Sequence, residues 1–366
     1  MKNYKPWKSK KQSTLFLSWF SKIELEKSVN IIREMEERIH CCYAGTSSHS
    51  MSSDDFVKMI LLDAIFILEL FHRYSTGDWD GDESDPLQPN QWMFSFVSLD
   101  LVLLENQLPF FVLEELFNLA FVHHSNSLSL IPLTFNFFQC FNVQNMGPEN
   151  VKIVHFTDLI RTFQLHLKPL IGWRTRMMVT LWNSATELHD AGVKFEGSSS
   201  KCLLDLHYEK GVLKMPRLEL DDQTEALVRN VMALEQFCHW NNVYLTDYFI
   251  FLDSLINTIE DINLLCDRGI LVNHLGDNKA ALSMVKKLIT NITCSGMSLE
   301  FTIICEGLNK FYKKPFHRLK ATLSVTTLKN QYFNNPWRGA GTIAACLLLL
   351  LTLIETIMSF VQVAKA

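Results

Sequence analysis

The last part of the chain constrains its fold most, because an apolar run from Gly339 to Val363 contains only one ionisable side chain, Glu355. As a helix, its 25 residues would extend about 37 Å, enough to cross a bilayer core about 30 Å thick with some tilt. Its leucine, isoleucine, phenylalanine and valine side chains contribute roughly −4 to −7 kcal/mol to insertion, against about +3 kcal/mol for the glutamate. The run therefore predicts a single transmembrane helix that contacts membrane lipid.

The charges beside this run predict its orientation. Six basic residues precede it, at Lys313, Lys314, Arg318, Lys320, Lys329 and Arg338, and Lys365 alone follows it. The positive-inside rule then places the large N-terminal part in the cytosol, as a tail-anchored protein of the plasma membrane or an endomembrane. Glu355 is either protonated in lipid or paired with another helix. Pairing is favoured, and it would make the chain a homo-oligomer through the span.

A second apolar stretch, LVLLENQLPFFVLEELF at 101–117, has a different interpretation. Glu105, Asn106 and Gln107 interrupt it, and Pro109 breaks the helical hydrogen-bond ladder. A charge at the centre of a span costs about 2.5–3.5 kcal/mol, several times what one leucine returns. This stretch is therefore predicted to be buried in protein.

The composition indicates a packed, mainly α-helical chain. Of 366 residues, 48% are hydrophobic and 26 are phenylalanine, while Gly (14) and Pro (10) are few. The net charge of −5 and a pI of about 6.2 exclude a bulk electrostatic footprint for nucleic acid. Nine cysteines without any C-x-x-C spacing favour reduced thiols over a disulfide framework.

Hydrophobic periodicity divides the chain into three regions. Residues 1–45 form a basic N-terminus and a first amphipathic helix, 46–331 a large helical domain, and 332–366 the anchor segment with its span at 339–363. Within the domain, residues 125–150 are expected to be a connection, and 151–167, 245–270 and 298–331 to be helices. Alternation around Lys210-Gly211 predicts one small β-hairpin near 202–220.

No pattern in the sequence predicts a catalytic, cofactor-binding or metal site. The G-x-S-x-G, phosphate-loop, dinucleotide and H-E-x-x-H motifs are absent. The acidic segment 76–90 lacks the glycine and the terminal glutamate of a calcium-binding loop. The clusters His40-Cys41-Cys42, His123-His124 and Cys238-His239 have no second pair of ligands at a suitable spacing.

Four other polar residues deserve an interpretation. Asp63 and Glu105 lie in apolar surroundings, and an enzyme whose site is assembled from distant residues would bring them together with His155 in a deep pocket. The favoured alternative is that such acids accept hydrogen bonds and fix the register of helices. Asn291 begins a glycosylation sequon, which matters only if that part of the chain is lumenal.

Several stretches resemble a plant family known as domain of unknown function 247, or UPF0481. The similar segments, in the family's order, are 54–71, 103–117, 184–195, 203–236, 244–278 and 332–337 with the apolar run that follows. Family members usually begin with a longer leader, so the chain is expected to be an N-terminally short member. The family commonly has a glutamine where this chain has Glu355.

The resemblance implies a protein that is not known as an enzyme. Some grass members are regarded as male-side determinants of pollen self-incompatibility, which would make the fold a platform for recognising a partner protein. The sequence therefore predicts a membrane-anchored, non-enzymatic interaction module with an unknown protein partner and no nucleic acid. Its surface loops at 76–90, 125–150 and 196–202 are the expected sites of partner choice. The alternative is an enzyme with a site built from polar residues of the helical core.

Overall fold

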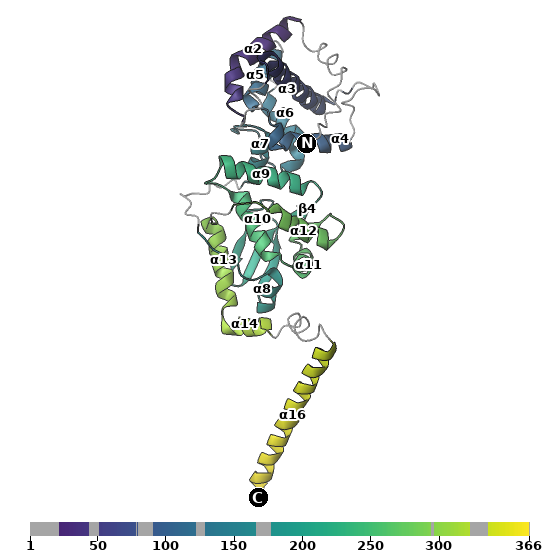
Figure 1. Ribbon diagram of the computed structural model, residues 1–366, viewed down its shortest axis with the longest axis vertical. Coiled ribbons are helices and arrows are strands. Elements are labelled where there is room, and N and C mark those ends of the chain that lie inside the picture. Colours follow the sequence, from purple (N-terminus) through teal and green to yellow (C-terminus); the bar gives the residue numbers. More distant parts are fainter. Residues whose placement is uncertain are drawn as a thin grey trace. The chain divides into compact units, whose positions relative to one another are not determined.

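The computed structural model describes residues 22–43, 51–77, 79, 91–121, 129–165, 177–293, 296–322 and 336–365 (Figure 1). Several predictions fall outside them, namely the basic stretch 1–21, most of the acidic segment 76–90, and His123-His124. The chain forms two compact units, one of 1–173, 200–204 and 221–246, the other of 174–199, 205–220 and 247–366. Both consist mainly of helices, as predicted.

The first unit contains helices and two short 3-10 turns. They are α2 (Lys22–His40), α3 (Ser53–Thr76), α4 (Gln91–Val102), η1 (Leu104–Asn106), α5 (Phe110–Phe121), α6 (Leu130–Phe137), η2 (Gln139–Phe141), α7 (Phe156–Gln164) and α9 (Thr224–Cys238). Helix α3 is the central element, since it packs against α2, α5 and α6. Ser52 caps its start by accepting the backbone N–H of Asp55 at 3.2 Å.

Phenylalanine rings form the centre of this unit. Phe71 of α3 lies 4.6 Å from Phe137 and 5.5 Å from Phe156 between ring centroids. Phe138 contacts Phe71, Phe137 and Phe156, and it is fully buried. Aromatic pairs in these tilted arrangements add stabilisation beyond the area that they bury. Four of the 26 phenylalanines therefore form one contiguous cluster at the centre of this unit.

The second unit combines helices with two small sheets. Its elements are α8 (Ala185–Ala191), β1 (Lys194–Ser198), β2 (His207–Glu209), β3 (Val212–Pro216), β4 (Leu218–Leu220), α11 (Ile259–Asp267), β5 (Leu271–Asn273), α12 (Asn278–Leu288), α13 (Leu299–Tyr312), α14 (Pro315–Thr322) and α16 (Pro336–Lys365). Most of α10 (Tyr244–Leu255) also belongs to it, because the division between the units falls after Thr246.

The predicted hairpin is confirmed, and it is part of a larger sheet. Strands β2 and β3 pair antiparallel around Lys210 and Gly211, which have φ values of 50° and 82°. Both central residues of a two-residue type I′ turn need positive φ. A Cβ on Gly211 would lie 2.7 Å from the Phe311 ring, so α13 packs tightly over the turn. Strand β1 pairs in parallel with β3, and β4 pairs in parallel with β5. The sequence prediction omitted both of these parallel pairings.

Several predicted boundaries were wrong. The expected connection at 125–150 contains α6 and η2, and the helix expected at 151–167 begins only at Phe156. The region 245–270 is two helices, and 298–331 begins with two further helices that Lys313 and Lys314 separate. Residues 196–198 of the expected loop 196–202 belong to β1. The errors at 245–270 and 298–331 come from extending a periodic pattern across a cap or a turn, whereas those at 125–150 and 196–202 come from missing a short helix and a strand.

The C-terminal segment forms one 30-residue helix, α16. Within the described residues, no single helix has both the length and the apolar composition that crossing a membrane requires. The helices Met93–Val102 and Leu104–Ala120, bent by 90° at their junction, meet both criteria as a pair, and Leu347–Met358 is apolar but shorter.

Candidate functional site

The polar residues inside the apolar stretch 101–117 stabilise a sharp elbow between α4 and α5. Gln107 donates from Nε2 to the carbonyl oxygens of Leu101 at 2.6 Å and Leu103 at 2.7 Å. Its Oε1 accepts the backbone N–H of Thr157 at 3.2 Å. Asn230 accepts the backbone N–H of Leu104 at 2.8 Å. These bonds satisfy backbone groups that a broken helix leaves unpaired.

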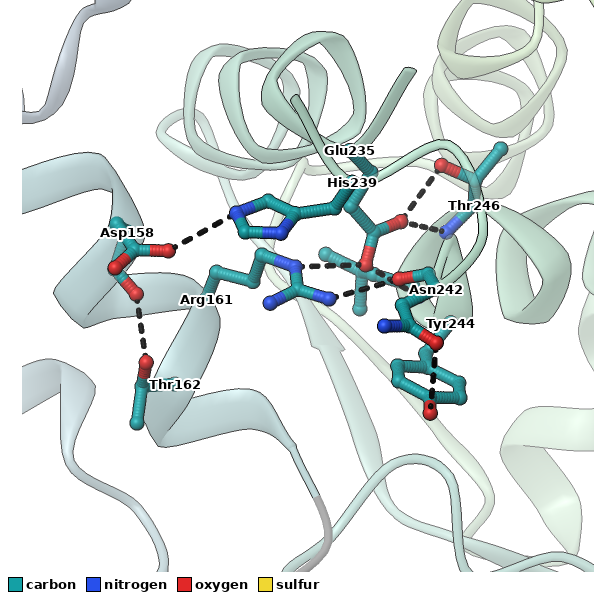
Figure 2. Close-up of polar contacts among 9 residues, drawn as sticks. Asp158, Arg161, Thr162, Glu235, His239, Asn242, Tyr244 and Thr246 are labelled. Atoms are coloured by element: carbon teal, nitrogen blue, oxygen red, sulfur yellow. Dashed lines mark hydrogen bonds and ion pairs between the residues drawn. The ribbon is translucent and has the colours of Figure 1, made fainter. Parts of the chain in front are cut away.

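Among the described residues of the first unit, the most deeply buried ion pair joins α7 and α9. Figure 2 shows the Arg161 guanidinium directed at both the Glu235 carboxylate and the carbonyl oxygen of Asn242. The Nε of Arg161 lies 3.3 Å from Oε1 of Glu235, and its Nη2 donates to Asn242 at 2.7 Å. The two side chains are 7% and 0% exposed. A charged pair at this depth is costly unless it is fully hydrogen-bonded.

The carboxylate of Glu235 also holds the start of α10. Oε2 accepts the backbone N–H of Thr246 at 2.9 Å and its hydroxyl at 2.8 Å, while Oε1 accepts the backbone N–H of Leu245 at 3.2 Å. These amides lie in the first turn of α10, where intrahelical partners are absent. Burial raises the pKa of Glu235, and the hydrogen bonds from Thr246 and the charge of Arg161 oppose that rise.

Two histidines lie next to this pair. His239 places Nε2 at 3.3 Å from Oδ1 of Asp158 (Figure 2). The ring of His155 accepts the backbone N–H of Asp158 at 3.3 Å and so caps α7. Burial lowers the pKa of both histidines, and for His239 the nearby Arg161 charge lowers it further. Both imidazoles are therefore more readily neutral than an exposed histidine.

This arrangement is a structural joint. Both oxygens of Glu235 are occupied by donors from the chain itself, so neither is directed at an open space. Together Arg161, Glu235 and Thr246 connect α7, α9 and the start of α10. Sequence analysis missed the pair, because Glu235 lies in an ordinary amphipathic helix. Thr246 is the third residue of α10.

The residues proposed for an enzyme pocket lie on or next to three different elements. Asp63 is half-buried on α3, Glu105 is exposed on η1, and His155 caps α7. Glu69, also on α3, pairs with Arg73 at 2.5 Å one turn away. These observations fit acids and caps that stabilise individual helices.

Among the residues that the structure describes, no group of three or more histidine, cysteine, aspartate or glutamate side chains could hold a metal ion. His40 stacks on Phe56 with ring centroids 3.9 Å apart, and Cys41 and Cys42 are exposed. Seven cysteines are free thiols: Cys41, Cys42, Cys140, Cys202, Cys238, Cys266 and Cys305. Asn291 is exposed after α12 and adopts a φ of 65°.

The fold is that of a mainly helical protein with one mixed three-stranded sheet and one parallel two-stranded sheet. The comparisons with known proteins assign its family. Residues 2–351 match the family DUF247, described as a plant protein of unknown function. The chain belongs to this family, as the sequence motifs predict.

Two proteins of Arabidopsis thaliana are similar to the chain. The UPF0481 protein At3g47200 is 29% identical over 93% of this chain and 75% of its own length. The putative UPF0481 protein At3g02645 is 26% identical over 47% of this chain and 32% of its own length. No solved structure matches.

Proposed function

We propose that this protein is a non-enzymatic interaction module held at a membrane by α16. The observation that carries the proposal is the exposure of large apolar side chains along this helix. Leu347 to Leu351, Leu353, Ile354, Ile357 and Met358 are each 54–70% exposed. A contiguous apolar surface of this kind normally marks contact with another apolar phase.

A bilayer fits this surface better than a groove on another protein. Five consecutive leucines, 347–351, place apolar side chains on every side of the helix. The sequence alone predicts that the apolar run 339–363 is long enough to cross a hydrocarbon core, whereas the apolar part of α16 found among the described residues, Leu347–Met358, is shorter. The hydroxyl of Thr352 donates to the carbonyl of Leu348 at 3.1 Å, and that of Thr356 donates to Thr352 at 2.7 Å. Hydroxyls that are satisfied within the helix cost little in lipid.

The basic residues that precede α16 support a cytosolic orientation of both compact units. Lys313, Lys314, Arg318 and Lys320 are exposed in the structure. Loops close to a span that are rich in lysine and arginine remain on the cytosolic side. Under this orientation, Asn291 carries no glycan and the free cysteines face a reducing compartment.

The role in interaction is supported by the form of the first unit. Its most buried charged pair is used to fix helices, and the family description names no activity. A rigid helical scaffold that presents variable surface segments is typical of a recognition protein. We propose that the chain binds a partner protein, as the resemblance implies for some grass members. Exchanging the segment 76–90, which the sequence predicts to be a surface loop, between relatives should change the partner, and unchanged binding would contradict this role.

Protease protection on intact membranes tests the anchor. The full chain carries a tag at each end, and glycosylation of Asn291 is measured in parallel with Asn291→Gln as its control. We expect resistance to alkaline extraction, digestion of the N-terminal tag and no glycan. Release by alkali would contradict anchoring, and a protected, glycosylated chain would reverse the orientation.

A matched pair of variants assigns the anchoring to α16. Leu349→Arg places a charge within the apolar run, at a cost of about 2.5–3.5 kcal/mol near the centre of a span. Leu299→Arg makes the same change at a side chain of α13 that is 51% exposed. The first variant should be extracted more readily than the second. Equal retention of both would assign membrane association to another part of the chain.

A further inference from the structure

Helix α14 presents an unusual combination of exposed basic and apolar side chains. The segment KKPFHRLK, residues 313–320, has four basic residues and no acidic residue, in a chain with a net charge of −5. Phe316 is 74% and Leu319 57% exposed. Lysine, arginine and large apolar side chains together on one short surface are typical of a helix that lies at a membrane interface.

The opposite face of α14 fixes it to the rest of the second unit. His317 stacks on Phe311 with ring centroids 3.9 Å apart, and its Nδ1 lies 3.0 Å from the carbonyl oxygen of Ala191. Ala321, one turn further along, is 5% exposed. Since His317 and Ala321 share the attached face, the exposure of Phe316 and Leu319 is a fixed property of the fold.

A cavity of about 930 Å³ lies beside these exposed side chains. Phe316, Leu319, Lys320, Lys194 and Arg268 contribute to its lining. Its acidic side chains are Asp190 and Glu196, and Glu196 also lies 3.8 Å from Lys214. The cations outnumber the acids, so the opening favours an anionic group.

An exposed tryptophan extends the same surface. Trp182 is 62% exposed, and Nζ of Lys313 lies 4.1 Å from the centroid of its ring. Tryptophan is enriched where membrane and water meet, because its ring is apolar at one end and polar at the other. The surface thus contains each kind of side chain that an interfacial site uses.

We infer that α14 and the adjoining cavity dock on the bilayer surface through anionic phospholipid headgroups, with Phe316 and Leu319 inserted between them. This inference rests on the proposed function, since anchoring by α16 holds α14 near the membrane. Thirteen residues, 323–335, connect Thr322 to Pro336, so the two helices lie within roughly 50 Å of each other. Lysine and arginine close to a cytosolic leaflet are attracted to its negative surface.

Photocrosslinking of the full chain tests this docking surface. Phe316 is replaced by p-benzoyl-phenylalanine, and the chain is reconstituted in vesicles of phosphatidylcholine or of a three-to-one mixture with phosphatidylserine. We expect lipid labelling to be roughly threefold or more higher in the mixed vesicles, and to fall at high salt. The same photoreactive residue at Leu299, about 20 Å away along α13, should label lipid weakly.

Charge reversal supplies a matched control. The pair K314E and K320E should reduce labelling from position 316 to the level seen in phosphatidylcholine, whereas K279E with K287E on α12 should leave it unchanged. Equal labelling in both lipids, or equal labelling from positions 316 and 299, would overturn the inference. Crosslinks from position 316 to an acidic protein in place of lipid would also overturn it.

Flotation of the phosphatidylcholine vesicles after an alkaline wash reports on α16 alone. If the chain floats and position 316 does not label lipid, the inference fails while the anchor stands. If the chain does not float, the proposed anchor fails. The docking inference is then tested separately, by whether position 316 labels lipid in phosphatidylserine-containing vesicles that are added to the chain.

Discussion

Asp261 accepts both the backbone N–H of Thr186 at 2.8 Å and its hydroxyl at 2.7 Å, although 75 residues separate the two. Its other oxygen accepts the backbone N–H groups of Asn257 at 3.0 Å and Thr258 at 2.9 Å. One fully buried carboxylate therefore holds the first turns of both α8 and α11. Burial alone would raise the pKa of Asp261, but the hydrogen bonds from Thr186 and Asn257 outweigh it and the pKa is lowered.

Asp261→Asn should destabilise the second unit at neutral pH. The amide cannot accept at every position that the carboxylate occupies, and each buried donor left unpaired costs about 1–3 kcal/mol. Because the folded pKa is depressed, the carboxylate's contribution is complete above its unfolded pKa of about 4 and is lost as the pH falls through the lower folded value. Thermal unfolding from neutral pH to about 3 should thus show a difference between wild type and variant that shrinks in acid. Asp267→Asn, an exposed change on the same helix, should match wild type throughout.

Glu235→Ala should be among the most damaging single changes in the first unit. It leaves Arg161 buried without its carboxylate and removes the acceptor for the first turn of α10, and breaking one side of a buried pair costs about 3–5 kcal/mol. Asp54→Ala, which removes an exposed ion pair with Arg33, should cost about 0–1 kcal/mol. Pulse proteolysis of the full chain compares the two. Similar losses for both variants would show that the buried pair is energetically ordinary.

The first unit should lose stability as the pH falls below about 6.5. The pKa values of His155 and His239 are lowered in the folded state. As the pH falls, these histidines are therefore protonated first in the unfolded chain, and this protonation stabilises the unfolded state relative to the folded state. The loss begins at the unfolded pKa and ends at the lower folded values. His155→Asn, which keeps an acceptor for the Asp158 amide, should flatten the profile. His274→Asn serves as the control, because His274 is exposed in the second unit.

Gln107→Ala should weaken the elbow between α4 and α5. The change removes both donors to the carbonyl oxygens of Leu101 and Leu103, and we expect a cost of about 1–3 kcal/mol. Asn106→Ala affects an exposed neighbour whose side chain donates to the Asp100 carbonyl at 3.1 Å, and its effect should be smaller. Amide hydrogen exchange across α5 would detect the difference. Equal protection in the two variants would contradict a central role for Gln107.

Sequence reasoning succeeded where one local signal determines the structure. Lys210-Gly211 between alternating residues predicted the hairpin, and the polar interruption at 105–107 predicted protein burial for 101–117. It failed where a cap interrupts a continuous apolar pattern. Thr258 and Asp261 form a capping box that starts α11, and this signal was present in the sequence. Pro315, which begins α14, also indicated a new helix start within the region 298–331 that was expected to be one helix.

Other features were inaccessible because they depend on distant parts of the chain. Strand β1 is recognisable only beside β3, which follows it after another strand. Glu235 looks like any helical glutamate until Arg161, 74 positions earlier, is placed next to it. The basic residues of α14 can be read from the sequence. The exposure of Phe316 follows only from the contacts that the opposite face of α14 makes in the structure. Tertiary packing, and not local pattern, decides these positions.

The division of the chain into units has a consequence for its synthesis. Neither unit is a continuous stretch, because 200–204 and 221–246 return to the first after the chain has begun the second. The Arg161–Glu235 pair forms only after α9 has left the ribosome, when 174–199 and 205–220 have already emerged. Nascent segments of both units must therefore remain incomplete at the same time, and no single cut in the chain would release either one intact.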